Sequence, residues 1–149
     1  LAHPERNHEL SQRFDMMLRM IKRGALMQLE AGSVVGAYGP IAQQCAIDMI
    51  DRRMCHFIAS DAHRPGAYDA LIPRAFEAVA ARVGQETAGA LFDANPSAAL
   101  ADRKPSFPEP MGDEEWQELV RRRGPGGEGG RRHGRRQSRE ARGIFGWFR

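Results

Sequence analysis

Apolar positions along the first hundred residues follow two kinds of spacing. Where they recur every three or four positions, as in HELSQRFDMMLRMIKR, one face of a helix would be apolar. Gly24 and Gly84 each follow such a segment and are typical helix stops, whereas Pro40 opens another and is typical of a first helical turn. The pattern predicts four helices, over residues 8–23, 40–53, 69–83 and 85–94.

Two short apolar runs lie between these helices. The first is Leu26 to Leu29 and the second is MCHFIAS at 54–60, and small or polar residues follow both. The order loop, helix, strand, helix, strand, helix, helix is typical of an α/β domain with parallel strands. In such domains functional side chains gather where loops leave the carboxyl ends of the strands.

The apolar pattern ends near residue 101. DRKPSFPEPMGDEEW is rich in proline, with one short helix expected over 112–123, and GPGGEGGRRHGRRQSREARG is low-complexity. Residues 121–149 hold ten arginines against two glutamates, a net charge of +8, so residues 1–120 carry −5 of the total +3. We expect a folded domain over 1–100, a proline-rich linker with a short helix over 101–120, and a disordered basic tail over 121–149.

The basic tail ends in the apolar sequence IFGWFR. Its arginines would neutralise nucleic-acid phosphates, but no aromatic residue is interleaved with the arginine run to stack on bases, which disfavours nucleic acid as a partner. A basic segment tipped with aromatic residues is better suited to an anionic membrane surface. The alternative is a solvated tail without a specific partner.

Side chains that can bind metals occur in two places, directly after the second predicted strand and in the first residues of the sequence. FIASDAHR places Asp61 and His63 two residues apart, and LAHPERN places His3 after a short apolar stretch. Carboxylates and imidazoles are ligands of divalent transition metals. Arg6 could hold an anion by bidentate hydrogen bonds. The alternatives are that Asp61 caps a helix, that His63 is an ordinary loop histidine and that Arg6 forms a surface ion pair.

The cysteines exclude one class of phosphatase. Cys45 and Cys55 are too few for a disulfide framework and fit a reducing compartment. Asp51 and Asp61 stand six positions after them, so the C-x5-R loop of cysteine-nucleophile phosphatases is absent. Because the sequence opens on Leu1, within an apolar-to-polar transition, we expect it to be a fragment or a processed product of a longer protein.

Four stretches together resemble a known family. LAHPERN, LMQLEAGSVVGAYG, CHFIASDAHR and the NP pair after the last predicted helix are similar, in content and spacing, to the later motifs of the polymerase-and-histidinol-phosphatase (PHP) superfamily. They most resemble the bacterial capsule and exopolysaccharide tyrosine phosphatases, manganese-dependent enzymes that act on membrane-associated tyrosine kinases. The resemblance covers about residues 1–100 and implies the C-terminal half of a distorted β/α barrel.

The resemblance also implies roles for particular residues. His3, Asp61 and His63 would be ligands of Mn²⁺, with other divalent metals possible, and Arg6 would contact the substrate phosphate. The implied chemistry is metal-assisted hydrolysis of a phosphomonoester, with His63 as a candidate proton donor to the leaving phenolate. Gln28 matches a position that supports the barrel.

The chain departs from the family pattern in two places. The family begins with an H-x-H strand and an early acidic motif that supply further metal ligands, and no part of this sequence matches them. The family also usually has a phosphate-facing arginine about five residues after the position of His63, where this chain has Tyr68. Arg64 would either replace that arginine or point to solvent.

The sequence therefore predicts a cytoplasmic, metal-dependent protein-tyrosine phosphatase of capsule or exopolysaccharide biosynthesis, peripheral at the inner face of the membrane. Its substrate would be a membrane-associated bacterial tyrosine kinase. Two alternatives remain open. The first is a noncatalytic remnant or interaction module that works through the basic tail. The second is a PHP phosphatase with another phosphoester substrate, such as histidinol phosphate or a nucleotide.

Overall fold

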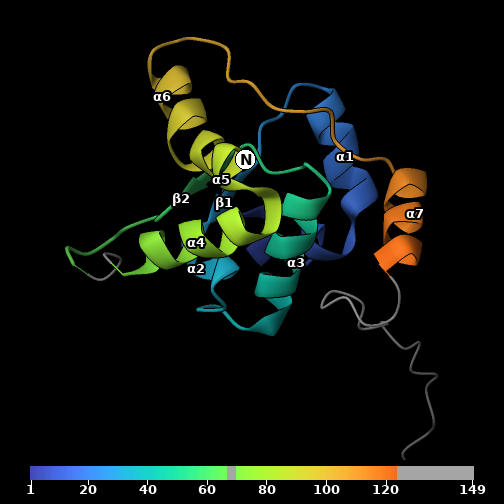
Figure 1. Ribbon diagram of the computed structural model, residues 1–149, viewed down its shortest axis with the longest axis horizontal. Helices are drawn as coiled ribbons and strands as arrows, with labels where there is room; N and C mark the ends of the chain where they lie inside the picture. Colours follow the sequence, from blue (N-terminus) through green and yellow to red (C-terminus); the bar gives the residue numbers. More distant parts are fainter. Residues whose placement is uncertain (67–69, 124–149) are drawn as a thin grey trace, which may run out of the picture.

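The computed structural model describes residues 1–66 and 70–123, and shows a small central sheet surrounded by helices (Figure 1). In chain order the elements are the 3-10 helices η1 (Pro4–Arg6) and η2 (Leu10–Gln12), α1 (Phe14–Lys22), β1 (Gln28–Glu30), α2 (Ala31–Val34), α3 (Pro40–Asp51), β2 (Phe57–Ala59), α4 (Leu71–Val83), α5 (Gln85–Gly89), the π-helical turn η3 (Ala90–Ala94), α6 (Asn95–Leu100) and α7 (Asp113–Arg123).

The sheet is parallel and β1 is its middle member. On one side β1 pairs with β2, with Gln28 opposite Phe57. On the other side Ala2 forms a parallel bridge with Gln28. There the Gln28 N–H donates to the carbonyl of Leu1 at 2.9 Å, and the His3 N–H donates to the carbonyl of Gln28 at 2.8 Å. All three segments therefore end at the same edge of the sheet, as the predicted α/β class requires.

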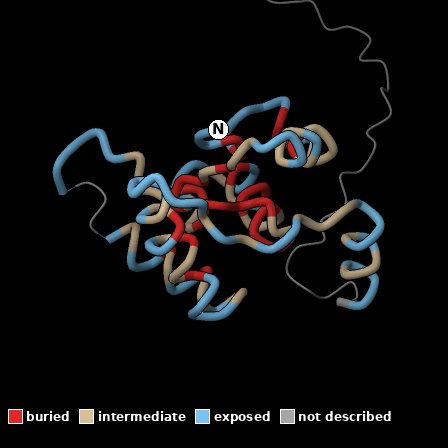
Figure 2. The backbone as a smooth tube through the Cα atoms, turned by 90° about the horizontal axis from the view of Figure 1, so that it is seen from above, coloured by how far each residue is buried: buried red, intermediate tan, exposed pale blue. Residues whose placement is uncertain are grey.

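The core lies between this sheet and the helices. Helix α2 packs against both α3 and α4, and the turn η3 packs against β2. Fully buried apolar side chains come from α1, β1, α3 and α4, and the buried backbone gathers in the middle of the molecule (Figure 2). They include Met17, Leu29, Met49 and Val79. The apolar periodicity in the sequence therefore points toward one common core.

The predicted helix over 8–23 forms only in its second half. Asn7 Oδ1 accepts hydrogen bonds from the N–H groups of Glu9 and Leu10, both at 3.0 Å. These bonds favour a local turn over the first turn of an α-helix. Arg13 then leaves the helical region at φ −126° and ψ 65°. The α-helix starts at Phe14, after the separate turn η2.

The expectation that the helix over 85–94 ends near Asn95–Pro96 is wrong. Elements α5, η3 and α6 follow one another without a break to Leu100. Pro96 lies in the first turn of α6, directly after the π-helical turn, where its missing N–H is tolerated. The Asn95 amide donates to the carbonyl of His56 at 3.2 Å, which ties this junction to the residue that precedes β2.

The proline-rich segment 103–112, here called the C-terminal strap, packs along the domain. The Ser106 N–H donates to Asn95 Oδ1 at 3.1 Å. The Phe107 ring meets the buried His56 ring edge-on, with 4.2 Å between centroids. The Met111 N–H donates to the carbonyl of Arg52 at 2.8 Å. Proline stiffens this segment, and these contacts fix its course over the domain.

Helix α7 is held by two arginines at the end of α3. The Arg52 guanidinium lies 4.6 Å from the centroid of the Trp116 ring and forms an ion pair with Asp113. Arg53 forms an ion pair with Glu115. The helix predicted over 112–123 is thus confirmed, and it extends to Arg123, three residues into the segment predicted as tail. The rest of that tail lies outside the described residues. No helix in the described part of the chain is long and apolar enough to cross a membrane.

Candidate functional site

The candidate site is the edge of the sheet where the three parallel segments end. His3 follows the Ala2 bridge, Glu30 is the last residue of β1, and Asp61 lies two residues beyond β2. His3 and Asp61 both have left-handed backbone conformations, with φ of 37° and 50°. Non-glycine residues seldom adopt such angles, and here they turn the chain out of the sheet at the edge.

Asp61 and His63 form a pair on the loop after β2. His63 Nε2 lies 3.5 Å from Asp61 Oδ2, and 73% of the His63 side chain and 33% of the Asp61 side chain are exposed. The alternative that Asp61 caps a helix is wrong, because α4 begins at Leu71 with Ala70 as its N-cap. A carboxylate and an imidazole are thus held close together at an accessible edge.

His3 lies at the same edge but on the opposite side of β1. Two strand spacings, about 10 Å, separate its segment from β2. In residues 1–66 and 70–123 no three His, Cys, Asp or Glu side chains form a group able to hold a metal ion. The donor types suit a divalent transition metal, but these residues present a pair and a separate imidazole, which is at most part of a metal centre. The prediction that all three bind metal stays a prediction.

Arg6 is held by two side chains that the sequence did not single out. Arg6 Nη1 donates to Glu30 Oε2 at 2.5 Å, and the Tyr38 hydroxyl donates to Glu30 Oε1. The guanidinium carbon of Arg6 lies 4.2 Å from the centroid of the Tyr38 ring. The Glu30 hydrogen bond raises the pKa of Arg6. The only signal in the sequence was the carboxylate of Glu30 directly after an apolar strand, the position that also drew attention to His3 and Asp61.

Glu5 ties η1, which carries Arg6, to the end of β1. Its Oε1 accepts hydrogen bonds from the Glu30 N–H at 3.1 Å and from the Ser33 hydroxyl at 2.7 Å. The side chain is buried, and burial raises the pKa of the Glu5 carboxyl. Glu5 thus satisfies backbone and hydroxyl donors where β1 turns into α2, and it fixes the segment from which Arg6 projects.

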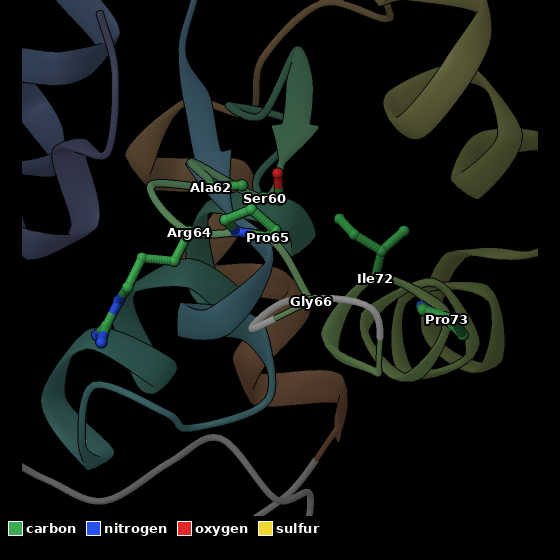
Figure 3. A pocket seen from close by; sticks show the side chains of 7 residues that line it. All are labelled: Ser60, Ala62, Arg64, Pro65, Gly66, Ile72 and Pro73. Atoms are coloured by element: carbon green, nitrogen blue, oxygen red, sulfur yellow. The ribbon is translucent and has the colours of Figure 1, made fainter.

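A cavity of about 480 Å³ lies beside the Asp61–His63 loop (Figure 3). It is lined by Ser60, Ala62, Arg64, Pro65, Gly66, Ile72 and Pro73. Figure 3 shows the Arg64 side chain extending away from Ile72 and Pro73. Arg64 is exposed, and its contact with the substrate stays a prediction. Tyr68, the position of the family's second arginine, lies outside the described residues.

The buried nucleophiles and the buried histidine have structural roles. Burial raises the pKa of Cys45 to about 12 and also raises the pKa of Cys55, so both stay protonated at neutral pH and neither is an activated thiolate. His56 Nδ1 accepts the Met27 N–H at 3.0 Å, and burial lowers the pKa of the imidazole. His56 is therefore packed inside the domain, with one ring nitrogen bonded to the backbone.

Comparisons with known proteins agree with the resemblance read from the sequence. A family model described as capsular polysaccharide synthesis, CpsB/CapC, matches residues 1–101. The putative tyrosine-protein phosphatase CapC of Staphylococcus aureus is 44% identical over 63 residues, which cover 42% of this chain and 25% of CapC. The tyrosine-protein phosphatase YwqE of Bacillus subtilis (strain 168) is 33% identical over 63 residues, with the same two coverages.

A solved structure supports the same relationship. It comes from work on YwqE of Bacillus subtilis and CpsB of Streptococcus pneumoniae, described as unique metal-dependent tyrosine phosphatases. The match has a TM-score of 0.68 and 25% sequence identity, and it covers 74% of this chain and 44% of that one. The chain therefore spans a quarter of the curated relatives and less than half of the solved one. The predicted α/β class fits this match.

Proposed function

The chain belongs to the CpsB/CapC family of capsular polysaccharide synthesis, and on that premise we propose that it is part of a metal-dependent protein-tyrosine phosphatase. The observation that carries the proposal is that Arg6, Asp61 and His63 all lie at one edge of a parallel sheet in a chain of this family. Within the proposal, the domain is the C-terminal half of a PHP-type β/α barrel. The remaining metal ligands would come from the part of the longer protein that precedes Leu1.

The residues of this chain would have distinct tasks in the reaction. His3, Asp61 and His63 would be ligands of Mn²⁺, which when bound would lower the pKa of a water and offset phosphoryl charge. Arg6 would hold two phosphoryl oxygens through its planar guanidinium. The role of proton donor to the leaving phenolate oxygen of phosphotyrosine would be an alternative role for His63, because an imidazole bound to the metal could give up its remaining proton only by becoming an imidazolate. Both cysteines are buried and protonated, which is consistent with hydrolysis that needs no cysteine nucleophile.

The proposed substrate is a phosphotyrosine protein, most simply a membrane-associated bacterial tyrosine kinase in the cytoplasm. The net charge of +8 on residues 121–149 supports attraction to an anionic membrane surface, which would bring the enzyme close to such a kinase. Sedimentation with lipid vesicles tests this part. Binding to anionic but not zwitterionic vesicles is expected, and equal binding to both would contradict it.

The test of the activity uses this chain and a version extended upstream. Hydrolysis of a phosphotyrosine peptide and bound manganese are measured on both, together with His63→Ala and a matched control, His8→Ala, in which an exposed histidine of the same protein is removed. We expect turnover in the extended protein that depends on Mn²⁺, is lost in His63→Ala and is kept in His8→Ala. An extended protein that binds no metal and hydrolyses no phosphotyrosine would refute the proposal, whereas preference for histidinol phosphate would change the substrate.

A further inference from the structure

Arg6 contacts the side chains of Glu30 and Tyr38, which lie on its buried side. We propose that these two side chains form a clamp that positions Arg6 for the substrate phosphate, so that Tyr38 and Glu30 are positioning residues. The proposal rests on the proposed function, because it takes the ligand of Arg6 to be a phosphoryl group. The clamp consists of Arg6, Glu30 and Tyr38 throughout.

The carboxylate of Glu30 divides its two oxygens between the other members of the clamp. Oε2 accepts from Arg6 and Oε1 accepts from the Tyr38 hydroxyl. Only 2% of the Glu30 side chain is exposed, whereas 38% of the Arg6 side chain is exposed. Water therefore competes little at the carboxylate, and hydrogen bonds to a buried charged group are stronger than those between neutral groups. The buried end of the clamp is fixed, and its open end is the guanidinium.

The ring of Tyr38 is placed by the local backbone. A Cβ atom at Gly32 would lie 2.6 Å from Tyr38 Cε2, so the ring rests directly on the backbone of α2. The chain returns to α2 through a turn in which Gly36 and Gly39 have φ of +80° and +89°. The Ala37 N–H donates to the carbonyl of Gly32 at 2.8 Å. Glycine at these positions therefore allows Tyr38 to reach both Glu30 and Arg6.

The clamp determines the plane of the guanidinium. A hydrogen bond at one nitrogen and a ring 4.2 Å away together restrict rotation of the group. Arginine carries five N–H donors in one plane, so those not used by Glu30 remain for a phosphate. Without the Tyr38 hydroxyl, Glu30 Oε1 would lose its donor, and the carboxylate would be free to rotate. Arg6 would then be held in several orientations instead of one, and fewer of them would face the phosphate.

Tyr38→Phe tests this directly, because it removes the hydroxyl and keeps the ring over Gly32 and Arg6. Glu30→Gln removes the charge with little change of shape, and Glu9→Gln, at an exposed position outside the clamp, is the matched control. Binding of inorganic phosphate is measured by NMR on the chain, together with relaxation of the Arg6 Nε–H group. For the extended protein, KM and kcat for a phosphotyrosine peptide are measured separately.

We expect Tyr38→Phe to weaken phosphate binding and raise KM by on the order of tenfold, the size of one hydrogen bond to a charged group, with a smaller change in kcat. Arg6 should become more mobile in Tyr38→Phe and Glu30→Gln and stay unchanged in Glu9→Gln. A merely structural role of Tyr38 would alter stability without loosening Arg6 in the folded protein.

The outcomes separate the clamp from the proposed function. If the extended protein hydrolyses phosphotyrosine, and if Tyr38→Phe has the same KM, phosphate affinity and Arg6 mobility as the unaltered protein, the proposal of the clamp is wrong and the proposed phosphatase activity is retained. If phosphate binds without turnover and Tyr38→Phe weakens that binding, the clamp is right and the phosphatase is wrong. If the unaltered protein neither binds phosphate nor turns over, both are overturned.

Discussion

Arg82→Met should destabilise the domain far more than the loss of an exposed ion pair. Arg82 Nε and Nη2 donate to Asp51 Oδ1 and Oδ2, both at 2.6 Å, and join the ends of α3 and α4. Only 2% of the Asp51 side chain and 26% of the Arg82 side chain are exposed. Removing the arginine deprives a buried carboxylate of a bidentate partner, which costs about 3–5 kcal/mol for a fully buried pair. Because Arg82 is partly solvated, we expect about 2–3 kcal/mol.

Urea unfolding measures this cost. With an m-value of about 1.5 kcal/mol per molar, Arg82→Met should lower the urea midpoint by roughly 1.3–2 M. The control is Arg19→Met, which removes an exposed ion pair with Asp15 and should cost about 0.5 kcal/mol or less. Adding Asp51→Asn to Arg82→Met should restore part of the stability, because the buried carboxylate that has lost its arginine is then removed. Equal midpoints for Arg82→Met and Arg19→Met would refute the reasoning.

Three further predictions concern the strap, a buried imidazole and the clamp. Phe107→Ala should lower the free energy of unfolding by about 2 kcal/mol, measured in urea, because the half-buried ring loses its packing on His56. Burial lowers the pKa of His56 below 6.5, so as the pH falls the unfolded chain binds a proton at this imidazole more readily than the folded chain does. The free energy of unfolding should therefore fall as the pH drops below about 6.5, and it should fall less in His56→Gln. Gly32→Ala should displace the Tyr38 ring and lower the thermal midpoint, at a cost of about 1–3 kcal/mol. A Gly89→Ala control, where an added Cβ meets no atom within 4 Å, should be stable.

The α/β order was predictable because spacing of apolar residues reports which faces are buried. The four helices and two strands predicted in the first hundred residues, and the helix predicted over 112–123, all have counterparts in the structure. The predicted helix boundaries were wrong where a side-chain hydrogen bond or a π-helical turn changed the course of the backbone. Asn7 caps a turn and delays α1, and the π-helical turn before Pro96 lets the chain continue as a helix. Neither effect is visible in hydrophobic periodicity, which carries no information about local hydrogen bonds.

The sequence predicted which residues of the candidate site lie at the ends of strands, but not which of their side chains come together. Parallel strands finish at one edge, so the placement of His3 and Asp61 followed from the order of elements. Whether their side chains meet depends on the order of the segments in the sheet, because β1 lies between the segment of His3 and β2. The spacing of residues along the sequence does not give this order. The clamp was missed because Glu30 and Tyr38 come together through a four-residue helix and a glycine turn. The strap was missed because proline-rich sequence lacks periodicity even when it packs.

The central claim is that His3, on one side of β1, shares metal ions with Asp61 and His63 on the other. The Mn²⁺ content of the upstream-extended protein, measured for His3→Ala, His63→Ala and the control His8→Ala, tests it most directly. The account predicts that His3→Ala and His63→Ala each retain less Mn²⁺ than His8→Ala. A Mn²⁺ content in His3→Ala equal to that in His8→Ala would contradict it.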